Sequence, residues 1–292
     1  MKNEYIFKRI IHWIEENIGE NISVKDVVNK SGYSTRSVHY LFNGYLGCGI
    51  YAYIKNRRLS LAAKLLKMTN VPIIEICSIY HFCSYQSFNR AFSIKFGASP
   101  ARYRRTTNWL LKEYTGNAAL ERPEIISQPI NLPQLKVMVN TSVFRGDFLS
   151  ALYGNQIIGC STLEIKEYIR TLVLKNMDRE NIMIAYRFKP GYHLNSLLKV
   201  SSSVLDKKGD NAPIQGQMID GGLYYQFHYE GTWEGYERLS DYIYWCELPR
   251  LKINKRKSMD LEFFDINKME KTNKFVVDFY VPVTSSTIVA LE

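Results

Sequence analysis

Two small groups of residues have the types and the spacing that chemistry requires. Cys77, His81 and Cys83 form a C-x3-H-x-C pattern that could coordinate a metal ion or take part in redox chemistry. The pattern lacks a fourth ligand, so we expect packing and turn roles for these residues and no metal site. His228 and Glu230 stand two residues apart on an expected strand, share one face and could act as a general acid and base. Because no nucleophile with a matched base accompanies them, we expect a protein that is not an enzyme and needs no cofactor.

A third group consists of polar side chains that could read DNA bases, and it belongs to an internal repeat. Residues 34–42 (STRSVHYLF) align with residues 84–92 (SYQSFNRAF) when the sequence is shifted by fifty residues. In each copy a serine, Ser34 or Ser84, can accept hydrogen bonds from the first backbone N–H groups of a helix, so a helix is predicted to begin at the next residue. Apolar side chains then recur at steps of three and four, which leaves the opposite face polar. Polar side chains near a helix start can reach base edges in a major groove, and here they are Thr35, Arg36, His39 and Tyr40, then Tyr85, Gln86, Asn89 and Arg90.

The segments around the repeat predict the helices that position these side chains. Ser23 and Asp26 form a capping box that opens a helix before the first copy, and residues 73–80 form a helix before the second. This is the spacing of a helix-turn-helix, found twice. Residues 50–66 lie between the copies and read as one helix about 25 Å long. Since successive major grooves on one face of DNA lie about 34 Å apart, one monomer could span two of them.

The charge of the chain is concentrated in its first third. Residues 1–107 hold 16 Lys and Arg against 6 Asp and Glu, whereas residues 108–292 hold 22 of each, so the net charge of +10 lies in the first segment. We expect a polyanionic partner, because Lys and Arg that neutralise phosphates release condensed counterions; the alternative is a basic face that serves solubility. No apolar run approaches the roughly 20 residues that span a membrane, and the first residues lack a signal-peptide stretch, so we expect a cytoplasmic protein without membrane contact. Five scattered cysteines favour reduced thiols.

The remainder of the chain has the pattern of a second, mixed domain. Several prolines between residues 106 and 135 interrupt the helical periodicity. Strand-forming runs and helical periodicity then alternate, which predicts an α+β domain. We therefore expect an all-α DNA-binding domain at residues 1–107, a linker at 108–133 and the α+β domain at 134–292. The expected strands are residues 135–139, 182–186 and 275–281, and the expected helices are residues 161–175 and 233–245.

The first domain resembles the DNA-binding part of the AraC/XylS regulators. The matching residues include Gly32-Tyr33-Ser34, Leu41-Phe42, Phe96-Gly97 and the run Ser99 to Arg104. The resemblance implies a bacterial transcription regulator that binds double-stranded DNA as a monomer, at a promoter site of about two helical turns, with RNA polymerase as a partner. Matching by position makes the base readers Arg36, His39, Tyr40, Tyr85, Gln86, Ser87, Asn89 and Arg90. His81 stands where the family usually has glycine, and His39 and Tyr40 replace glutamine and arginine, which changes the expected base sequence.

The second domain resembles the GyrI-like effector-binding domain. The resemblance rests on residues 221–231 (GGLYYQFHYEG) and 278–283 (DFYVPV). It implies a duplicated strand-helix-strand-strand fold around a cleft for a small apolar or cationic effector, with Asp278 in the place of a ligand-facing acid. Aromatic faces beside a desolvated carboxylate suit an apolar cation, although aromatic residues on strands are often core. The expected ligand-binding residues are Asp278, Tyr224, Phe227, Tyr229, Trp233, Tyr244 and Phe279.

These observations together predict a transcription regulator, an activator of the stress or multidrug response type, whose second domain modulates its activity. Two alternatives concern the second domain. It could hydrolyse small adducts through His228 or Glu230, or it could have lost its ligand and serve as an interaction module.

Overall fold

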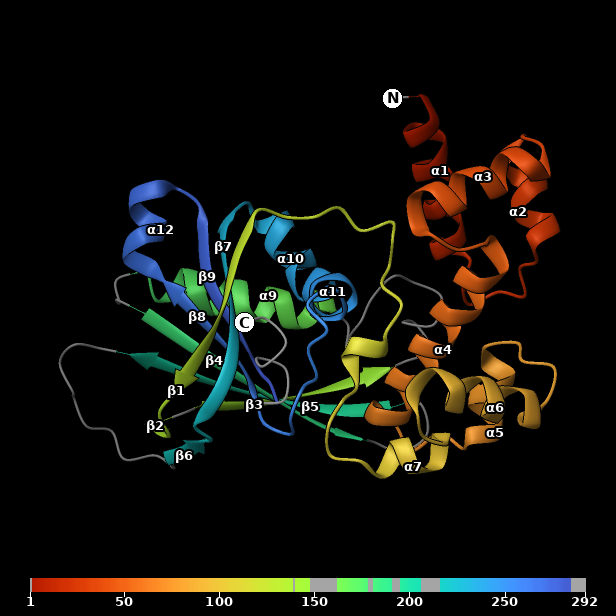
Figure 1. Ribbon diagram of the computed structural model, residues 1–292. Coiled ribbons are helices and arrows are strands. Elements are labelled where there is room, and N and C mark those ends of the chain that lie inside the picture. The colour runs from red at the N-terminus through yellow and green to blue at the C-terminus, as the bar shows by residue number, and fades with distance from the viewer. Residues whose placement is uncertain are drawn as a thin grey trace.

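The computed structural model describes residues 2–138, 140–147, 162–177, 181–190, 195–205 and 216–284. Figure 1 shows a helical N-terminal part, coloured red to yellow, beside a part in which helices lie against an antiparallel sheet. The predicted fold class, an all-α domain followed by an α+β domain, is confirmed. Among the described residues, no helix is long and apolar enough to cross a lipid bilayer.

Local capping sets the starts of the helices in the N-terminal part. The side chains of Ser34 and Ser84 accept hydrogen bonds from the backbone N–H groups three residues later, at 3.2 and 3.1 Å. Ser23 and Asp26 form the reciprocal capping box. All three predicted helix starts are confirmed. The helices are α1 (Lys2–Glu16), α2 (Val24–Ser31), α3 (Thr35–Leu46), α4 (Ile50–Met68), α5 (Ile73–Ile79), α6 (Tyr85–Phe96) and α7 (Pro100–Arg105).

The two copies of the repeat end alike as well as start alike. Gly47 and Gly97, fifty residues apart, have φ angles of 66° and 67°. This left-handed conformation costs glycine little, and it ends α3 and α6 by directing the backbone N–H back to a carbonyl four residues earlier. The repeat therefore corresponds to two helix-turn-helix units, α2–α3 and α5–α6, joined by α4.

Each helix-turn-helix unit has its own apolar packing. Helices α1 to α3 and the start of α4 enclose a cluster that includes Ile14, Val27 and Phe42. The second unit packs Phe88 and Phe92 against the end of α4 and against Tyr103 of α7. These side chains lie at the three- and four-residue steps of the sequence pattern, because that spacing puts them on one face of each helix.

The second part of the chain is built on a seven-stranded antiparallel sheet with the strand order β1-β7-β9-β8-β4-β5-β3. A two-stranded ribbon, β2 and β6, forms a separate sheet. The strands are β1 (Ile125–Leu132), β2 (Leu135–Met138), β3 (Asn140–Asp147), β4 (Asn181–Pro190), β5 (Asn195–Leu205), β6 (Gly216–Ile219), β7 (Gly222–Gly231), β8 (Asp260–Asp265) and β9 (Phe275–Pro282). The other elements are η1 (Leu111–Glu113), α9 (Thr162–Lys175), α10 (Trp233–Tyr242), the π-helix η2 (Ile243–Glu247), α11 (Leu248–Arg250) and α12 (Ile266–Thr272).

The sheet contains the same strand-helix-strand-strand unit twice. In the first unit, β3-α9-β4-β5, the last strand pairs with both others; in the second, β7-α10-β8-β9, the last strand again pairs with both others. The two units meet where β4 pairs with β8, and we call this strand pair the seam. The expected duplicated architecture is thus present, and the seam brings together residues that lie far apart in sequence.

The two faces of the sheet have different environments. Along β7, Tyr225, Phe227 and Tyr229 face the cluster that includes α9 and α10. The alternate residues of β7 point to the opposite face, as the pleat of a strand requires. There Tyr224 is buried in a smaller cluster with Leu261 and Tyr280. We call these the helix face and the open face.

The expected linker at residues 108–133 contains ordered elements. Helix η1 packs Leu111 into the core, and β1 forms one edge of the main sheet by pairing along β7. The main sheet of the second domain therefore includes residues before 134, the expected start of that domain. Residues 114–119 lie between these elements and contact α4, where Thr115 N–H donates to Ser60 Oγ at 2.8 Å.

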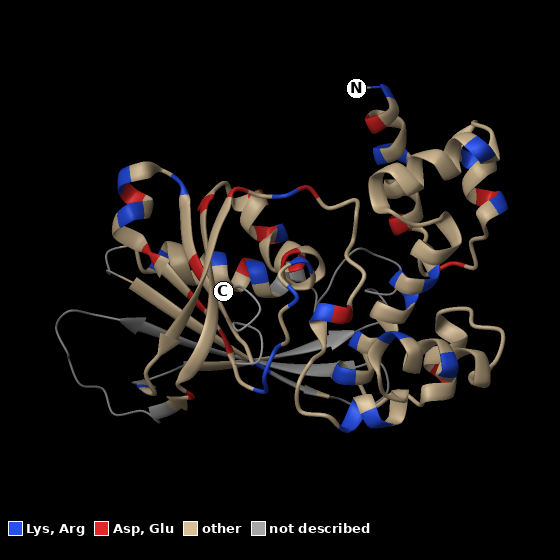
Figure 2. Cartoon of the chain, viewed as in Figure 1, with Lys and Arg blue, Asp and Glu red and all other residues tan. Residues whose placement is uncertain are grey.

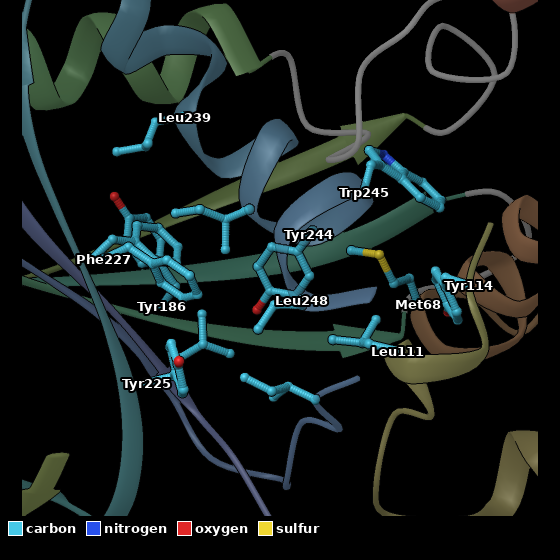
Figure 3. Close-up of a cluster of buried hydrophobic side chains, with 14 of the residues drawn as sticks. Met68, Leu111, Tyr114, Tyr186, Tyr225, Phe227, Leu239, Tyr244, Trp245 and Leu248 are labelled. Atoms are coloured by element: carbon cyan, nitrogen blue, oxygen red, sulfur yellow. The ribbon is translucent and has the colours of Figure 1, made fainter. Parts of the chain in front are cut away.

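The two domains share one hydrophobic core. A single cluster includes Met68 of α4, Tyr114 of the connecting segment and Trp245 of η2. Figure 3 shows these side chains in a row that continues through Tyr244 to Phe227 on the sheet. The rings of Tyr114 and Trp245 are 5.6 Å apart. The second domain therefore packs directly against the DNA-binding part.

Candidate DNA-reading surface and ligand site

Helix α3 presents polar side chains at its start. Arg36 is exposed, and Tyr40 is exposed by 73%. His39 is half-buried, and its Nδ1 lies 3.8 Å from where a Cβ on Gly49 would stand. The structure therefore leaves Arg36 and Tyr40 open to solvent, while His39 leans toward the start of α4.

Helix α6 repeats this arrangement with one difference. Tyr85, Gln86 and Arg90 are exposed at its start. The hydroxyl of Ser87 instead donates to the carbonyl of Ser84 at 2.8 Å and accepts from the backbone N–H of Ser84 at 3.2 Å. Asn89 is half-buried, and its Oδ1 has no hydrogen-bond partner among the described residues. Ser87 is thus used for capping, whereas the amide of Asn89 keeps an acceptor without a partner.

Buried polar contacts join α1 to α4, the helix that connects the two helix-turn-helix units. On α4, the guanidinium of Arg57 donates from Nε and Nη2 to the carboxylate of Glu15 in α1, each at 2.9 Å. Tyr53 donates to the same carboxylate at 2.6 Å. Burial lowers the pKa of Arg57, but the charge and hydrogen bonds of Glu15 raise it by more, so the net shift is upward. This pair ties α1 to the middle of α4.

The loop after α1 is held by α4 and by the turn of the second unit. Arg58 donates to the carbonyls of Ile18 and Glu20, and His81 Nε2 lies 2.8 Å from the carbonyl oxygen of Gly19. His81 has a φ of 57°, the left-handed conformation that glycine would adopt there without cost. Histidine in place of the family's glycine therefore adds a contact between the turn before α6 and the loop after α1.

Part of the positive charge of the first domain is structural. Figure 2 shows Lys and Arg on α4 and α7, the helices beside α6. Arg57 and Arg58 are buried, and Lys67 donates to the carbonyls of Tyr103 and Thr106. Burial lowers the pKa of Lys67 to about 8. The full excess of positive charge is therefore not available at the surface, because several of these cations make contacts within the protein.

A second candidate site lies at the seam on the helix face. Its centre is the carboxylate of Glu262 on β8, which is only 1% exposed. One oxygen, Oε2, accepts hydrogen bonds from the hydroxyls of Tyr186 on β4 and Tyr236 on α10, at 2.6 and 2.7 Å. The other oxygen, Oε1, lies 3.9 Å from Nζ of Lys166 on α9. Both halves of the duplicated fold thus contribute to one buried acidic site.

A second buried carboxylate stands two residues away on the same face of β8. Asp260 accepts a hydrogen bond from Tyr244 at 2.6 Å and forms an ion pair with Lys255. Burial and the nearby carboxylates raise the pKa values of Tyr186, Tyr236 and Tyr244 well above the usual value. These hydroxyls therefore remain protonated and act as donors to the two acids.

The open face carries a separate polar group around His228. Its Nδ1 lies 2.7 Å from Asp278, and its Nε2 lies 2.9 Å from Glu230, which also pairs with Lys268. Burial lowers the pKa of His228, but the hydrogen bonds to Glu230 and Asp278 raise it by more. Hydrogen bonds from Lys268 and His228 lower the pKa of Glu230 to about 2. Both ring nitrogens of His228 face carboxylates, so neither is placed to activate a nucleophile.

Comparison with known proteins agrees with this two-part arrangement. The helix-turn-helix domain family matches residues 27–106, and the GyrI-like small molecule binding domain family matches residues 192–284. The right origin-binding protein of Escherichia coli (strain K12) is 28% identical over 272 residues, which cover 88% of this chain and 89% of the relative. The transcriptional regulator Rob of Salmonella typhimurium is 26% identical over 296 residues, covering 95% of this chain and 98% of the relative.

A shorter relative matches the first domain more strongly. The Transposon Tn10 TetD protein of Escherichia coli is 38% identical over 107 residues, which cover 37% of this chain and 78% of the relative. The chain belongs to the AraC/XylS family of transcription regulators. The resemblances predicted for both domains are confirmed, and this AraC/XylS regulator joins its DNA-binding domain to a GyrI-like domain.

The structure divides the predicted ligand residues of the regulator between the two faces of the sheet. Asp278 and Tyr224 lie on the open face, where Asp278 is bound to His228. The aromatic residues Phe227, Tyr229 and Phe279 are buried on the helix face. Tyr244 lies beside Asp260, and Trp233 starts α10 with its ring 4.9 Å from that of Phe275. The seven residues therefore do not surround one site.

The acidic site at the seam was missed in the sequence. A signal for it exists in residues 260–265 (DLEFFD), where Asp260 and Glu262 alternate with apolar residues. Acids two apart on a strand share a face, and Phe264, two further on, faces the buried core. An acid in register with a core phenylalanine predicts a buried carboxylate that needs partners.

The cysteine and histidine pattern of the second unit has structural roles in this regulator. Cys77 is buried and its Sγ lies 3.7 Å from the carbonyl oxygen of Phe82, while His81 forms the turn. Cys83 is exposed beside the cap of α6. Within the described ranges, no three His, Cys, Asp or Glu residues are grouped as metal ligands would be.

Proposed function

We propose that this AraC/XylS regulator activates transcription by reading two successive major grooves with α3 and α6. The observation that carries the proposal is the repeated, serine-capped helix with exposed polar side chains on one face, which include Arg36 in the first unit and, at a different position of the repeat, Arg90 in the second. Helix α4 joins the units and, at 1.5 Å per residue, its 19 residues span about 28 Å. The predicted readers are Arg36, His39, Tyr40, Tyr85, Gln86, Asn89 and Arg90, while Ser87 completes the capping box of α6 with Ser84.

Relatives support the activating role and the partners. AarP of Providencia stuartii is named a transcriptional activator, and a Yersinia pestis relative is named the F1 operon positive regulatory protein. RNA polymerase is accordingly the proposed protein partner at promoters. Double-stranded DNA is the proposed ligand of α3 and α6.

The test compares specific and random DNA. A specific site is first selected from a random oligonucleotide pool with the full chain. Arg36→Ala and Arg90→Ala are each expected to weaken binding to it by about 1–3 kcal/mol and to leave binding to random DNA much less changed. Lys271→Ala, on α12 at the far side of the second domain, removes an exposed charge as a control (Figure 1). Equal losses on both DNAs would contradict base reading.

The second domain is proposed to bind a small apolar cation at the seam. The support is a buried carboxylate, Glu262, held between aromatic rings from both halves of the fold. Desolvated acids and ring faces attract cations whose bodies are apolar. Asp278 is the weaker choice of acid because it is half-exposed and already bound to His228.

Tetraphenylphosphonium is a suitable probe of this site. We expect it to raise the melting temperature of the full chain, to do so far less in Glu262→Gln, and to act normally on Asp278→Asn. A shift that is lost in Asp278→Asn and kept in Glu262→Gln would move the site to the open face. The absence of any shift would favour an interaction module without a ligand.

A further inference from the structure

The ammonium of Lys166 occupies an unusual place beside Glu262. Its Nζ lies 3.8 Å from the ring centroid of Tyr236 and 3.9 Å from Oε1 of Glu262. The side chain of Lys166 is only 8% exposed although α9 has an outer face open to water. A cation over an aromatic ring and next to a buried acid is the arrangement expected of a bound cationic ligand.

We propose that Lys166 is a tethered internal cation that fills the ligand position of the seam, so that an external cation binds only by displacing it. This inference rests on the proposed ligand site and adds how that site is controlled. Lys166 reaches it from one half of the duplicated fold, whereas Tyr236 and Glu262 belong to the other half.

The contacts of Lys166 are those of an exchangeable group. The distance of 3.9 Å to Glu262 exceeds the 2.7–2.9 Å typical of a charge-assisted hydrogen bond. The neighbouring pair differs, because Lys255 donates directly to Asp260 from five residues away in sequence. Lysine also has a long flexible stem that can carry its ammonium to the surface while its helix stays in place.

The ammonium of Lys166 lies among acidic groups. Burial lowers the pKa of Lys166 by more than Glu262, Asp241 and Glu237 raise it, so the net shift is downward. Without a cation, the carboxylate of Glu262 would be buried with no compensating charge from α9, which is unfavourable. A displacing ligand must therefore bring its own positive charge, and it must have an apolar face for the ring of Tyr236. Neutral and anionic molecules do not satisfy this requirement.

Amine labelling of the wild-type chain tests the displacement directly. The full protein is acetylated with a water-soluble N-hydroxysuccinimide ester, with and without saturating tetraphenylphosphonium, and the modified lysines are quantified by mass spectrometry. We expect the labelling rate of Lys166 to rise several-fold with the probe. Lys255 is the internal control, since it is equally buried but paired with Asp260, and its rate should not change. Saturable binding of the probe with no change at Lys166 would overturn the proposal.

Lys166→Met gives an independent measurement, because methionine keeps the length of the side chain and removes its charge. If the lysine occupies the site nine-tenths of the time, the variant should bind tetraphenylphosphonium about tenfold more tightly than wild type. Adding Glu262→Gln should abolish the gain. Equal affinities of wild type and Lys166→Met would refute displacement and leave the ligand site standing. No binding by either protein would refute both, while the DNA-binding test remains separate.

Discussion

Replacing Glu15 by alanine leaves the guanidinium of Arg57 buried without its carboxylate. Each residue of this pair is 2% exposed, and three hydrogen bonds of 2.9 to 3.1 Å join them. Removing one partner of a buried pair costs about 3–5 kcal/mol, since the charge that remains cannot reach water. Tyr53 also loses the acceptor of its 2.6 Å hydrogen bond. We therefore expect Glu15→Ala to lower the free energy of unfolding by this amount.

The pair also predicts how a second change should behave. Arg57→Met alone leaves Glu15 buried and should cost a similar amount, but the double variant buries no charge. Its loss should be smaller than the sum of the two single losses by about 2–3 kcal/mol, the coupling expected of residues in direct contact. Urea unfolding of the full chain, followed by circular dichroism, measures all three variants.

A matched control exists on the same helix. Glu4 pairs with Lys8 at 3.4 Å, but their side chains are 53% and 61% exposed. Glu4→Ala should therefore cost less than about 1 kcal/mol, as exposed ion pairs do. If Glu15→Ala is as mild as Glu4→Ala, or if the double variant loses the full sum, the pair does not hold α1 to α4 as argued.

Three further changes follow from local geometry. Ser84→Ala removes the cap of α6 and should cost about 0.5–2 kcal/mol in urea unfolding and weaken specific DNA binding; unchanged stability would argue against the cap. Gly116→Ala places a Cβ 2.5 Å from the carbonyl oxygen of Trp245, so it should cost about 1–3 kcal/mol and increase proteolysis between the domains, whereas Gly44→Ala meets no atom within 4 Å and should not. His228 has a raised pKa in the folded protein, so the stability it contributes is complete below its unfolded pKa of about 6.5 and is lost as pH rises through the folded value. His228→Ala should therefore lower the melting temperature more at acidic than at alkaline pH, and the opposite trend would contradict the ion contacts on the open face.

The helical domain could be predicted closely because its signals are local. Each cap lies within three residues of the helix that it starts, and each apolar stripe is visible within one helix. The strand β1 was missed because Pro129 interrupts it and its alternation is weak. Proline is tolerated there because β1 is an edge strand that pairs on one side only, with β7.

The ligand site could not be predicted in the same way. Asp278 and Phe279 are neighbours on one strand and so point to opposite faces of the sheet, but which face meets the helices depends on how the strands pair. The seam pairs Ile184 with Glu262, residues of different halves of the fold, and no local pattern specifies this contact. The π-helix η2 likewise lies within a segment whose sequence has the pattern of an ordinary α-helix.

The two helix-turn-helix units are attached unequally to the GyrI-like domain. The second unit, the end of α4 and the sheet share one hydrophobic core, whereas the first unit has a separate core. The helical segment from Trp233 to Arg250 runs without a break from the acidic site, where Tyr236 contacts Glu262, to α4, where Trp245 lies 4.4 Å from the guanidinium of Arg57. Arg57 is also the residue that holds Glu15 of α1. Because protein interiors are close-packed, the contacts of one helical segment connect the seam to the residue that ties α1 to α4.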